Sequence, residues 1–161
     1  MIALFLGLII VVFDQLTKQA VQRNLVFGES RPLIDGFFNL VYVRNDGAAW
    51  NILSGYGWVL ILISFFVLIF LLWFRKSLFG EDGIFQQIIM GFLVGGILGN
   101  LIDRIHFGWV TDFLDFEFGS YHFPSFNVAD SAICISVGLY LINNFFFQKK
   151  KEEKEAVALE E

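Results

Sequence analysis

Four apolar runs, each long enough to cross a lipid bilayer, constrain this chain more than any other feature of its sequence. We expect four membrane helices, at about residues 2–23, 57–74, 84–105 and 126–147. A hydrocarbon core ~30 Å thick takes ~20 helical residues to span, and 57% of the 161 residues are hydrophobic. The chain is therefore expected to be a single polytopic membrane domain, residues 1–161, without a second globular unit.

Basic residues set the expected orientation of these helices. Arg75 and Lys76 follow the second run, and three lysines at residues 149–151 follow the fourth. Under the positive-inside rule both groups are cytoplasmic, and both termini are then cytoplasmic as well. The segments at about 24–56 and 106–125 face outward, although Arg31 and Arg44 lie on that side. The Lys/Glu-rich tail, about 148–161, is expected to be a solvated or disordered cytoplasmic end.

The outward segments carry the pattern of a small sheet. Residues 37–43 are mostly aromatic and β-branched, which predicts a strand, and Gly36 and the Asp46-Gly47 pair bracket it with turn signals. Residues 109–123 alternate aromatic side chains with acidic ones and are expected to add strands. The predicted fold class is an all-α membrane protein, a four-transmembrane-helix bundle that carries a small extracytoplasmic β-sheet and loop domain.

Two Asn-x-x-Asp patterns lie at the outer ends of the third and fourth runs: Asn100 with Asp103, and Asn127 with Asp130. Asp103 lies ~19 residues into an outward-running helix, roughly 28 Å along its axis. Asp130 lies about one turn into a helix that runs inward, so the two carboxyl groups reach a similar depth. An ionisable group inside a membrane costs ~2.5–3.5 kcal/mol on insertion scales, which makes two facing Asp residues a functional-site hypothesis. Two carboxylates that share a proton are also the working groups of an aspartic protease.

Lines of small residues predict where these carboxyl groups point. Glycines at residues 91, 95 and 99 lead at a spacing of four to Asp103, and such a stripe lets a neighbouring helix approach closely. Asp130, Cys134 and Gly138 form a second line of small residues on the fourth run. We therefore expect both carboxyl groups to point into the bundle and to meet.

The same residues also have structural explanations. Asp103 is suitably placed for an ion pair with Arg104 or Lys18, and Asp130 for a first-turn position favoured by the helix dipole. Asp14 and Lys18 are spaced four apart on the first run, which suits either an internal ion pair or a pair that orients a substrate or the neighbouring loop.

The remaining polar positions give weaker signals. Asn45 follows the predicted strand, and Gly47 leaves room there for a ligand backbone; an ordinary turn is the alternative. His106 and His122 lack the spacing of metal ligands. Cys134 is the single cysteine, so no internal disulfide can form, and its position deep in a helix favours a small packing residue. We expect no metal and no cofactor.

Five segments in this order resemble the lipoprotein signal peptidases, also called the signal peptidase II family. They are residues 14–18 (DQLTK), 45–50 (NDGAAW), 95–104 (GGILGNLIDR), 110–113 (VTDF) and 123–130 (FPSFNVAD), and they span nearly the whole chain. The third is similar to the GG-x-x-GN-x-x-DR motif that carries one catalytic Asp of that family, and the fifth resembles the block that carries the other. The sequence departs from the family pattern at Trp50, where Phe is usual, and at Asn51, where a small residue is frequent.

The resemblance implies an aspartic-type membrane endopeptidase that cleaves a prolipoprotein before its diacylglyceryl-modified Cys. Asp103 and Asp130 are the expected catalytic residues, one ionised to polarise a water and one protonated toward the scissile carbonyl; Asp112 is the next candidate. The supporting residues implied are Asp14, Lys18, Asn45, Gly47, Asn100, Arg104, Asn127 and Ala129. Expected partners are lipid-modified signal peptides, membrane lipid and cyclic peptide inhibitors such as globomycin, without nucleic acid. The expected location is the bacterial cytoplasmic (inner) membrane, with the site near the outer leaflet and a lid formed by residues 45–51.

A proton-coupled transporter or channel is the rival interpretation, because intramembrane Asp and Lys also mark proton relays. The charges cluster at the outer end and leave the cytoplasmic half almost purely apolar, which argues against a path across the whole membrane. A passive membrane scaffold is a third interpretation, and it leaves the paired Asn-x-x-Asp patterns unexplained. Cleavage of a lipidated precursor by the purified protein separates the three.

Overall fold

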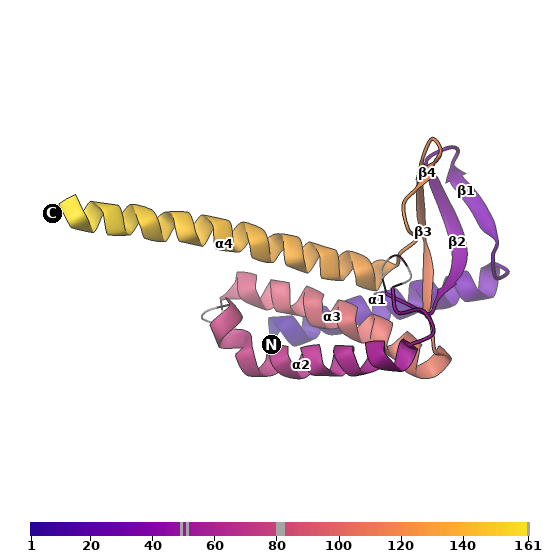
Figure 1. The fold of residues 1–161 in the computed structure, drawn as a ribbon, viewed down its shortest axis with the longest axis horizontal. Helices are drawn as coiled ribbons and strands as arrows, with labels where there is room; N and C mark the ends of the chain where they lie inside the picture. Colours follow the sequence, from indigo (N-terminus) through magenta and orange to yellow (C-terminus); the bar gives the residue numbers. More distant parts are fainter. Residues whose placement is uncertain (49, 51, 80–82, 161) are drawn as a thin grey trace.

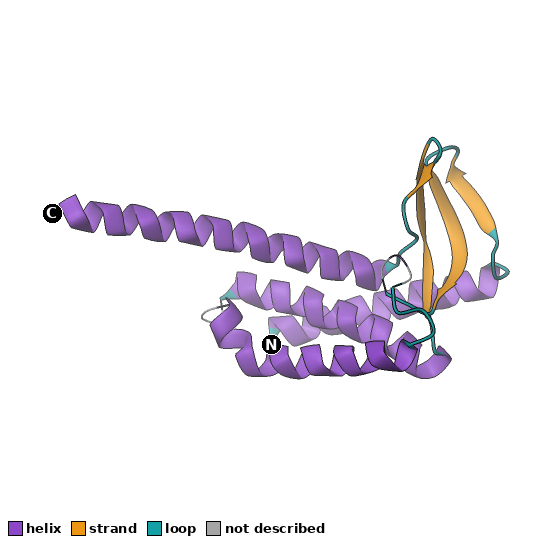
Figure 2. Cartoon of the chain, in the orientation of Figure 1, coloured by secondary structure: helices purple, strands orange, loops and turns teal. Residues whose placement is uncertain are grey.

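The chain forms a four-helix bundle with a four-stranded sheet at one end (Figures 1 and 2). The structure, a computed structural model, describes residues 1–48, 50, 52–79 and 83–160, and the side chains of all of these except 79 and 146–160. The elements in chain order are α1 (Ile2–Asn24), β1 (Ser30–Ile34), β2 (Phe38–Asn45), α2 (Gly57–Phe79), α3 (Ile84–Phe107), β3 (Val110–Phe118), β4 (Tyr121–His122) and α4 (Val128–Glu160). The four predicted helices are confirmed. In the described part of the chain, each of the four contains a segment long and apolar enough to cross a membrane.

Helix α3 is the centre of the bundle. It packs against α1, α2 and α4, and it lies between α2 and α4 in Figure 1. Its glycines permit this close packing: a Cβ added to Gly95 would lie 2.9 Å from the backbone oxygen of Gly7 on α1. A Cβ added to Gly96 would lie 2.5 Å from the backbone oxygen of Ala129 on α4. The predicted role of the glycine stripe is therefore confirmed, and it brings α1 and α4 to α3 at the level where the acidic residues lie.

The matching small-residue line predicted on α4 is wrong. Cys134 is exposed, and a Cβ added to Gly138 would meet nothing within 4 Å. The close contact from α4 is made instead by Ala129, which is fully buried, and by Ile133, whose Cγ1 would lie 2.7 Å from a Cβ added to Gly96. Ala129 and Ile133 lie roughly 100° around the helix from the predicted line, so they line the face that approaches α3 in place of Cys134 and Gly138.

Helix α4 continues beyond its apolar part. The segment suited to cross a membrane is Val128–Phe145, and the helical backbone extends to Glu160. The tail is thus helical where disorder was one of two expectations. Lys, Glu and Ala are strong helix formers, and Glu and Lys spaced four apart stabilise a helix further, which accounts for the continuation.

The sheet has the order β1-β2-β3-β4 and its neighbouring strands are antiparallel. The strand predicted at residues 37–43 corresponds to β2, and the acidic–aromatic segment supplies β3 and β4. Strand β1 was not predicted; it is an exposed edge strand that contains Pro32, a residue that edge positions tolerate because they need no ladder donor. Val21 of α1 and Leu25, the residue that follows α1, pack with Tyr42 and Phe113, and this apolar cluster joins the sheet to the bundle.

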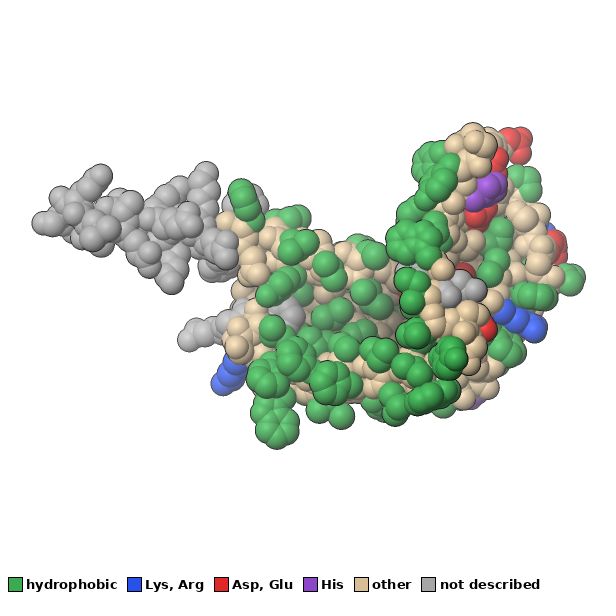
Figure 3. Space-filling view, in the orientation of Figure 1, with side chains coloured by type: hydrophobic (Ala, Val, Ile, Leu, Met, Phe, Trp, Pro, Cys, Tyr) green, Lys and Arg blue, Asp and Glu red, His purple; other side chains and the backbone are tan. Residues whose placement is uncertain are grey.

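Apolar and charged side chains occupy different parts of the surface. Apolar side chains cover the visible face of the helices, and most of the visible acidic and histidine side chains gather on the sheet (Figure 3). Both the N-terminus and the end of α4 lie at the end of the bundle away from the sheet (Figure 1).

Candidate active site

Four carboxyl groups from four different elements converge where the bundle meets the sheet. They belong to Asp14 on α1, Asp103 on α3, Asp112 on β3 and Asp130 on α4. Asp14, Asp103 and Asp112 are only 0%, 1% and 2% exposed, whereas Asp130 is half-buried and can be reached from outside. The prediction that Asp103 points into the bundle is confirmed by this burial.

Lys18 neutralises the inner part of this acidic cluster. Its Nζ lies 2.8 Å from Asp14 Oδ2 and 3.3 Å from Asp103 Oδ2, and it donates a hydrogen bond of 3.0 Å to Asn100 Oδ1. These contacts use all three ammonium donors. The predicted ion pair of Asp14 with Lys18 is confirmed, and so is the structural alternative in which Asp103 pairs with Lys18.

Asp103 is held on both oxygens. Oδ1 accepts a hydrogen bond of 2.9 Å from Gln15 Nε2, and Oδ2 accepts one of 3.0 Å from the backbone N–H of Thr111 in addition to the Lys18 contact. Asp14 is anchored in the same way, because its Oδ1 accepts a hydrogen bond of 2.9 Å from the backbone N–H of Ala129 at the start of α4. Asp14 therefore joins α1 to α4, and Asp103 joins α3 to α1 and to the sheet.

Two asparagine amides connect this inner cluster to Asp130. Asn100 Oδ1 accepts hydrogen bonds from Lys18 and from Asn127 Nδ2 (3.1 Å). The Nδ2 of Asn100 therefore faces outward, and it donates a hydrogen bond of 2.7 Å to Asp130 Oδ1. The backbone N–H of Asn127 donates 3.2 Å to Asp130 Oδ2. The route from Asp103 to Asp130 thus runs through Lys18 and Asn100.

Asp112 is the carboxyl group that shares its surroundings with Asp130. Asn127 Nδ2 donates 2.7 Å to Asp112 Oδ1, so the side chain of Asn127 binds Asp112 while its backbone binds Asp130. Asn45 Nδ2 donates 2.9 Å to Asp112 Oδ2. Burial raises the pKa of Asp112 to about 7, and the neighbouring charge of Asp130 acts in the same direction. Near neutral pH, Asp112 can therefore hold a proton beside the half-buried carboxyl group of Asp130.

Arg104 faces this pair and ties it to the loop that follows β2. Its charge interacts with Asp130, Asp112 and Asp103, and its Nη2 donates 2.9 Å to the backbone oxygen of Gly47. The backbone N–H of Gly47 in turn donates 3.0 Å to Asn45 Oδ1. Within the described residues, Arg104 Nε is buried and has no hydrogen-bond partner, which leaves a donor available at the site.

The base of the loop that follows β2 is fastened by one side chain. Asp46 Oδ1 accepts 2.7 Å from Ser54 Oγ, and Asp46 Oδ2 accepts 3.1 Å from the backbone N–H of Gly55. Trp50 lies in this loop with a φ of 52° and is 69% exposed. The predicted lid, residues 45–51, is described except for residues 49 and 51, which lie outside the described residues.

All ten predicted site residues lie in or beside this cluster, and two further contributors, Gln15 and Thr111, were not singled out. Gln15 and Thr111 hold Asp103, and Asp112 was named only as a reserve candidate. Gln15 and Thr111 lie inside the segments that carry the family resemblance, so those segments were the available signal. His122 is 60% exposed and lies 3.5 Å from Asp115 on the sheet. Across the part of the chain that the structure describes, no group of three His, Cys, Asp or Glu is arranged to hold a metal ion.

Comparison with known proteins places this site in a family. The family model described as Signal peptidase (SPase) II matches residues 6–146. A lipoprotein signal peptidase of Syntrophotalea carbinolica is 42% identical over 88% of this chain and 89% of its own length. One from Bacillus pumilus is 37% identical over 92% of this chain and 95% of its own length. A solved structure titled as a bacterial membrane enzyme matches with a TM-score of 0.83 and 37% identity, over 92% of this chain and 90% of that one.

Proposed function

We propose that Asp112 and Asp130 form the catalytic pair of this chain, which belongs to the signal peptidase II family and removes signal peptides from prolipoproteins. The observation that carries this proposal is the double contact of Asn127, whose side chain binds Asp112 and whose backbone binds Asp130. The assignment differs from the pair predicted from the sequence, Asp103 with Asp130.

The contacts of Asp103 favour a positioning role. Its carboxylate receives hydrogen bonds from Gln15 and Thr111 and pairs with the ammonium of Lys18, all in a setting that is 1% exposed. A buried carboxylate whose two oxygens are engaged by protein donors is out of reach of a substrate. Such a group is well suited to fix the Lys18–Asn100 contact that reaches Asp130.

The pair supports hydrolysis by general acid and base catalysis. In this mechanism Asp130 is the ionised member of the pair, a form favoured by the hydrogen bonds to both of its oxygens and by the charge of Arg104. It takes a proton from a water whose oxygen attacks the scissile carbonyl carbon. Asp112 holds a proton and donates a hydrogen bond to the carbonyl oxygen. When the tetrahedral intermediate collapses, the C–N bond breaks, and the proton held by Asp130 passes to the leaving amine.

The bond cleaved is the one before the diacylglyceryl-modified Cys of the precursor. The leaving amine is then the new N-terminus of the lipoprotein, and the new carboxylate ends the signal peptide. The apolar surface of the bundle supports reaction within the bilayer, where both the signal peptide and the acyl chains reside (Figure 3).

The orientation that fits this reaction has both termini in the cytoplasm and the acidic cluster near the outer leaflet. Arg75 and Lys76 lie near the end of α2 that is away from the sheet, which agrees with the positive-inside rule. The site lies where α3 ends and α4 begins, at the end of the bundle that carries the sheet.

The loop that follows β2 acts as a lid on the substrate. The Arg104–Gly47 and Asp46–Ser54 contacts fasten it beside the catalytic pair. Cyclic peptide inhibitors such as globomycin bind under it, and Asn45→Ala weakens both inhibitor binding and turnover. A titration of globomycin against purified enzyme and variant checks this, and equal affinities would leave Asn45 as an ordinary turn residue.

The pair is tested by comparing Asp112→Asn, Asp130→Asn and Asp103→Asn, each purified and confirmed as folded. Asp112→Asn and Asp130→Asn abolish cleavage of a lipid-modified precursor, and the double variant is little worse than either, because the two groups act as a unit. Infrared difference spectra show a carboxyl group that titrates near neutral pH; this signal disappears in Asp112→Asn and persists in Asp103→Asn. Loss of the signal in Asp103→Asn, together with cleavage by Asp112→Asn, would instead support the pair Asp103 with Asp130.

A further inference from the structure

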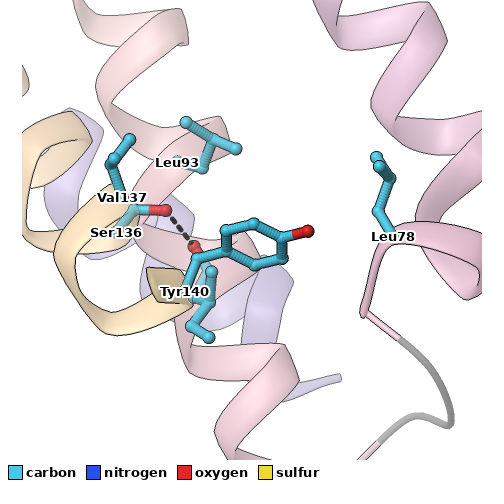
Figure 4. Close-up of a pocket in the computed structure, with 6 residues that line it drawn as sticks. Leu78, Leu93, Ser136, Val137 and Tyr140 are labelled. Atoms are coloured by element: carbon cyan, nitrogen blue, oxygen red, sulfur yellow. Dashed lines mark hydrogen bonds between the residues drawn. The ribbon is translucent and has the colours of Figure 1, made fainter. Parts of the chain in front are cut away.

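An apolar groove lies along α3, between α2 and α4 (Figure 4). Its volume is about 170 Å³, and it is lined by Leu78, Ile89, Leu93, Ser136, Val137 and Tyr140. The hydroxyl of Ser136 donates 3.0 Å to the backbone oxygen of Ile89, so this polar group is already paired. None of the described residues that line the groove is charged. Its chemistry therefore suits a purely hydrocarbon ligand segment.

The groove is open to the side. Val137 is 47% exposed, and the ring of Tyr140 extends from α4 toward Leu78 of α2 (Figure 4). Helices α2 and α4 both pack on α3, one on either side of it (Figure 1). A segment that already lies in the bilayer can thus reach the groove laterally, without passing through water.

The groove is aligned with the acidic cluster on two helices. Val137 comes seven residues after Asp130 on α4, and Leu93 comes seven residues before Asn100 on α3. Seven residues are about two helical turns, so each pair shares a face and is separated by ~10 Å along the axis. Tyr140 and Ile89 extend the lining to ~15 Å from the cluster by the same rise.

This separation matches the length of a particular ligand. A helical segment of ~7–10 residues spans 10–15 Å at ~1.5 Å per residue. The apolar region of a secretory signal peptide is ~7–15 residues long and precedes the cleavage site. A signal peptide whose scissile bond lies at Asp130 would therefore place its apolar region in the groove.

We propose that this groove binds the apolar region of the prolipoprotein signal peptide and sets how that region is presented to the catalytic pair. The inference rests on the removal of signal peptides by this chain and not on which carboxyl groups carry the chemistry. Continuity with the site and the length match favour the substrate over a membrane lipid or a second copy of this chain.

The first experiment is site-specific photo-cross-linking with a matched control. A photoreactive amino acid is placed at Val137 or at Ile135, which are equally exposed at 47%. Ile135 lies roughly 160° from Val137 around α4 at 100° per residue, so it faces away from the groove. The probe is a full-length lipid-modified precursor in liposomes, and Val137 is expected to yield several-fold more cross-linked precursor than Ile135. Equal yields, or cross-links from Val137 to lipid or to a second copy of the enzyme alone, would overturn the proposal.

The second experiment fills the groove. Val137→Trp raises KM for the full-length precursor several-fold with kcat little changed, whereas Ile135→Trp leaves KM unaltered. A precursor whose signal peptide is shortened to a few residues before the Cys is cleaved equally by both variants and the parent enzyme. An unchanged KM in Val137→Trp with the full-length precursor would contradict the proposal. An incorrect catalytic pair would show itself differently, as cleavage by Asp112→Asn with the cross-linking pattern intact.

Discussion

Replacing Asn45 by Ala should move the alkaline limit of the reaction to higher pH. In the proposed mechanism Asp112 must hold a proton, so activity is present below its pKa and is lost as the pH rises through it. Burial raises the pKa of Asp112 to about 7, and the hydrogen bonds from Asn45 and Asn127 oppose that rise by stabilising the ionised form. Removal of the Asn45 donor therefore raises the pKa further and extends activity into more alkaline solution.

The size of the shift follows from the hydrogen bond that is lost. Asn45 Nδ2 donates 2.9 Å to Asp112 Oδ2. A hydrogen bond to a charged group contributes about 1.5–3 kcal/mol, and each pKa unit corresponds to about 1.4 kcal/mol, so the loss raises the pKa by about one to two units. With a shift of one unit, the protonated fraction of Asp112 at pH 8 rises from about a tenth to about a half, roughly fivefold.

The assay is the pH dependence of kcat with a lipid-modified precursor, measured from acid to alkaline pH and scaled to each enzyme's own maximum. Ser54→Ala is the control, because Ser54 fastens the same loop through Asp46. That control is expected to lower the rate without moving the alkaline limit. An alkaline limit that stays in place in Asn45→Ala, or moves to lower pH, would refute the role given to Asp112. So would an equal shift in Ser54→Ala, since it would trace the effect to the loop.

Three further outcomes follow from buried contacts. Lys18→Met leaves its acidic partners without their cation; breaking a buried ion pair costs about 3–5 kcal/mol, so thermal unfolding in detergent should begin at a clearly lower temperature. Gly96→Leu forces a side chain against the Ala129 backbone, so the variant should no longer elute as a monodisperse peak in size-exclusion chromatography. Gly138→Ala is the control: a Cβ there meets nothing within 4 Å, so the change should be neutral or should stabilise the protein by up to about 1 kcal/mol. The pKa of Asp112 is higher in the folded protein than in the unfolded chain, so wild-type stability should fall as the pH rises from about 4 to about 7 and level off above; Asp112→Asn should remove that slope, as measured by thermal unfolding across this range.

The helices could be predicted from the sequence because membrane insertion depends on local composition. A run of apolar residues must satisfy its backbone internally, and in isolation only a helix does so. The ends were less predictable: α2 continues to Phe79 and α4 to Glu160, because helix formers extend a helix beyond its apolar part. Strand β1 escaped prediction because every residue in it is exposed, so no buried face leaves a trace in the sequence.

The orientation of α4 shows the limit of reading helix faces from residue size. Cys134 and Gly138 are small, and they share a face with Asp130, yet the face that meets α3 is defined by Ala129 and Ile133. The backbone N–H of Ala129 donates to Asp14 Oδ1, which fixes the rotation of α4 from a different helix. Such a contact between residues far apart in the chain leaves no local spacing to detect.

The same reasoning explains why the sequence favoured Asp103 over Asp112. Helical spacing relates Asp103 to the glycines of its own helix, but nothing in that spacing describes where β3 lies. After α3 the chain reverses at Gly108, whose φ of 82° suits glycine, and β3 then pairs with β2 so that Asp112 is opposite Val43. This pairing brings Asn45 to Asp112 and leaves the backbone N–H of Thr111 at Asp103.

The asparagines of the two Asn-x-x-Asp patterns thus play more similar roles than the aspartates do. Asn100 and Asn127 each accept on Oδ1 and donate from Nδ2, and both donate to a carboxyl group of the proposed pair. Asn100 is oriented by Lys18, so the buried ions behind it determine which of its atoms faces Asp130. In this arrangement Asp103 acts at a distance, by holding Lys18 in place. A substitution at Asp103 can therefore impair cleavage without Asp103 ever contacting the substrate, and loss of activity alone does not identify a catalytic carboxylate in this cluster.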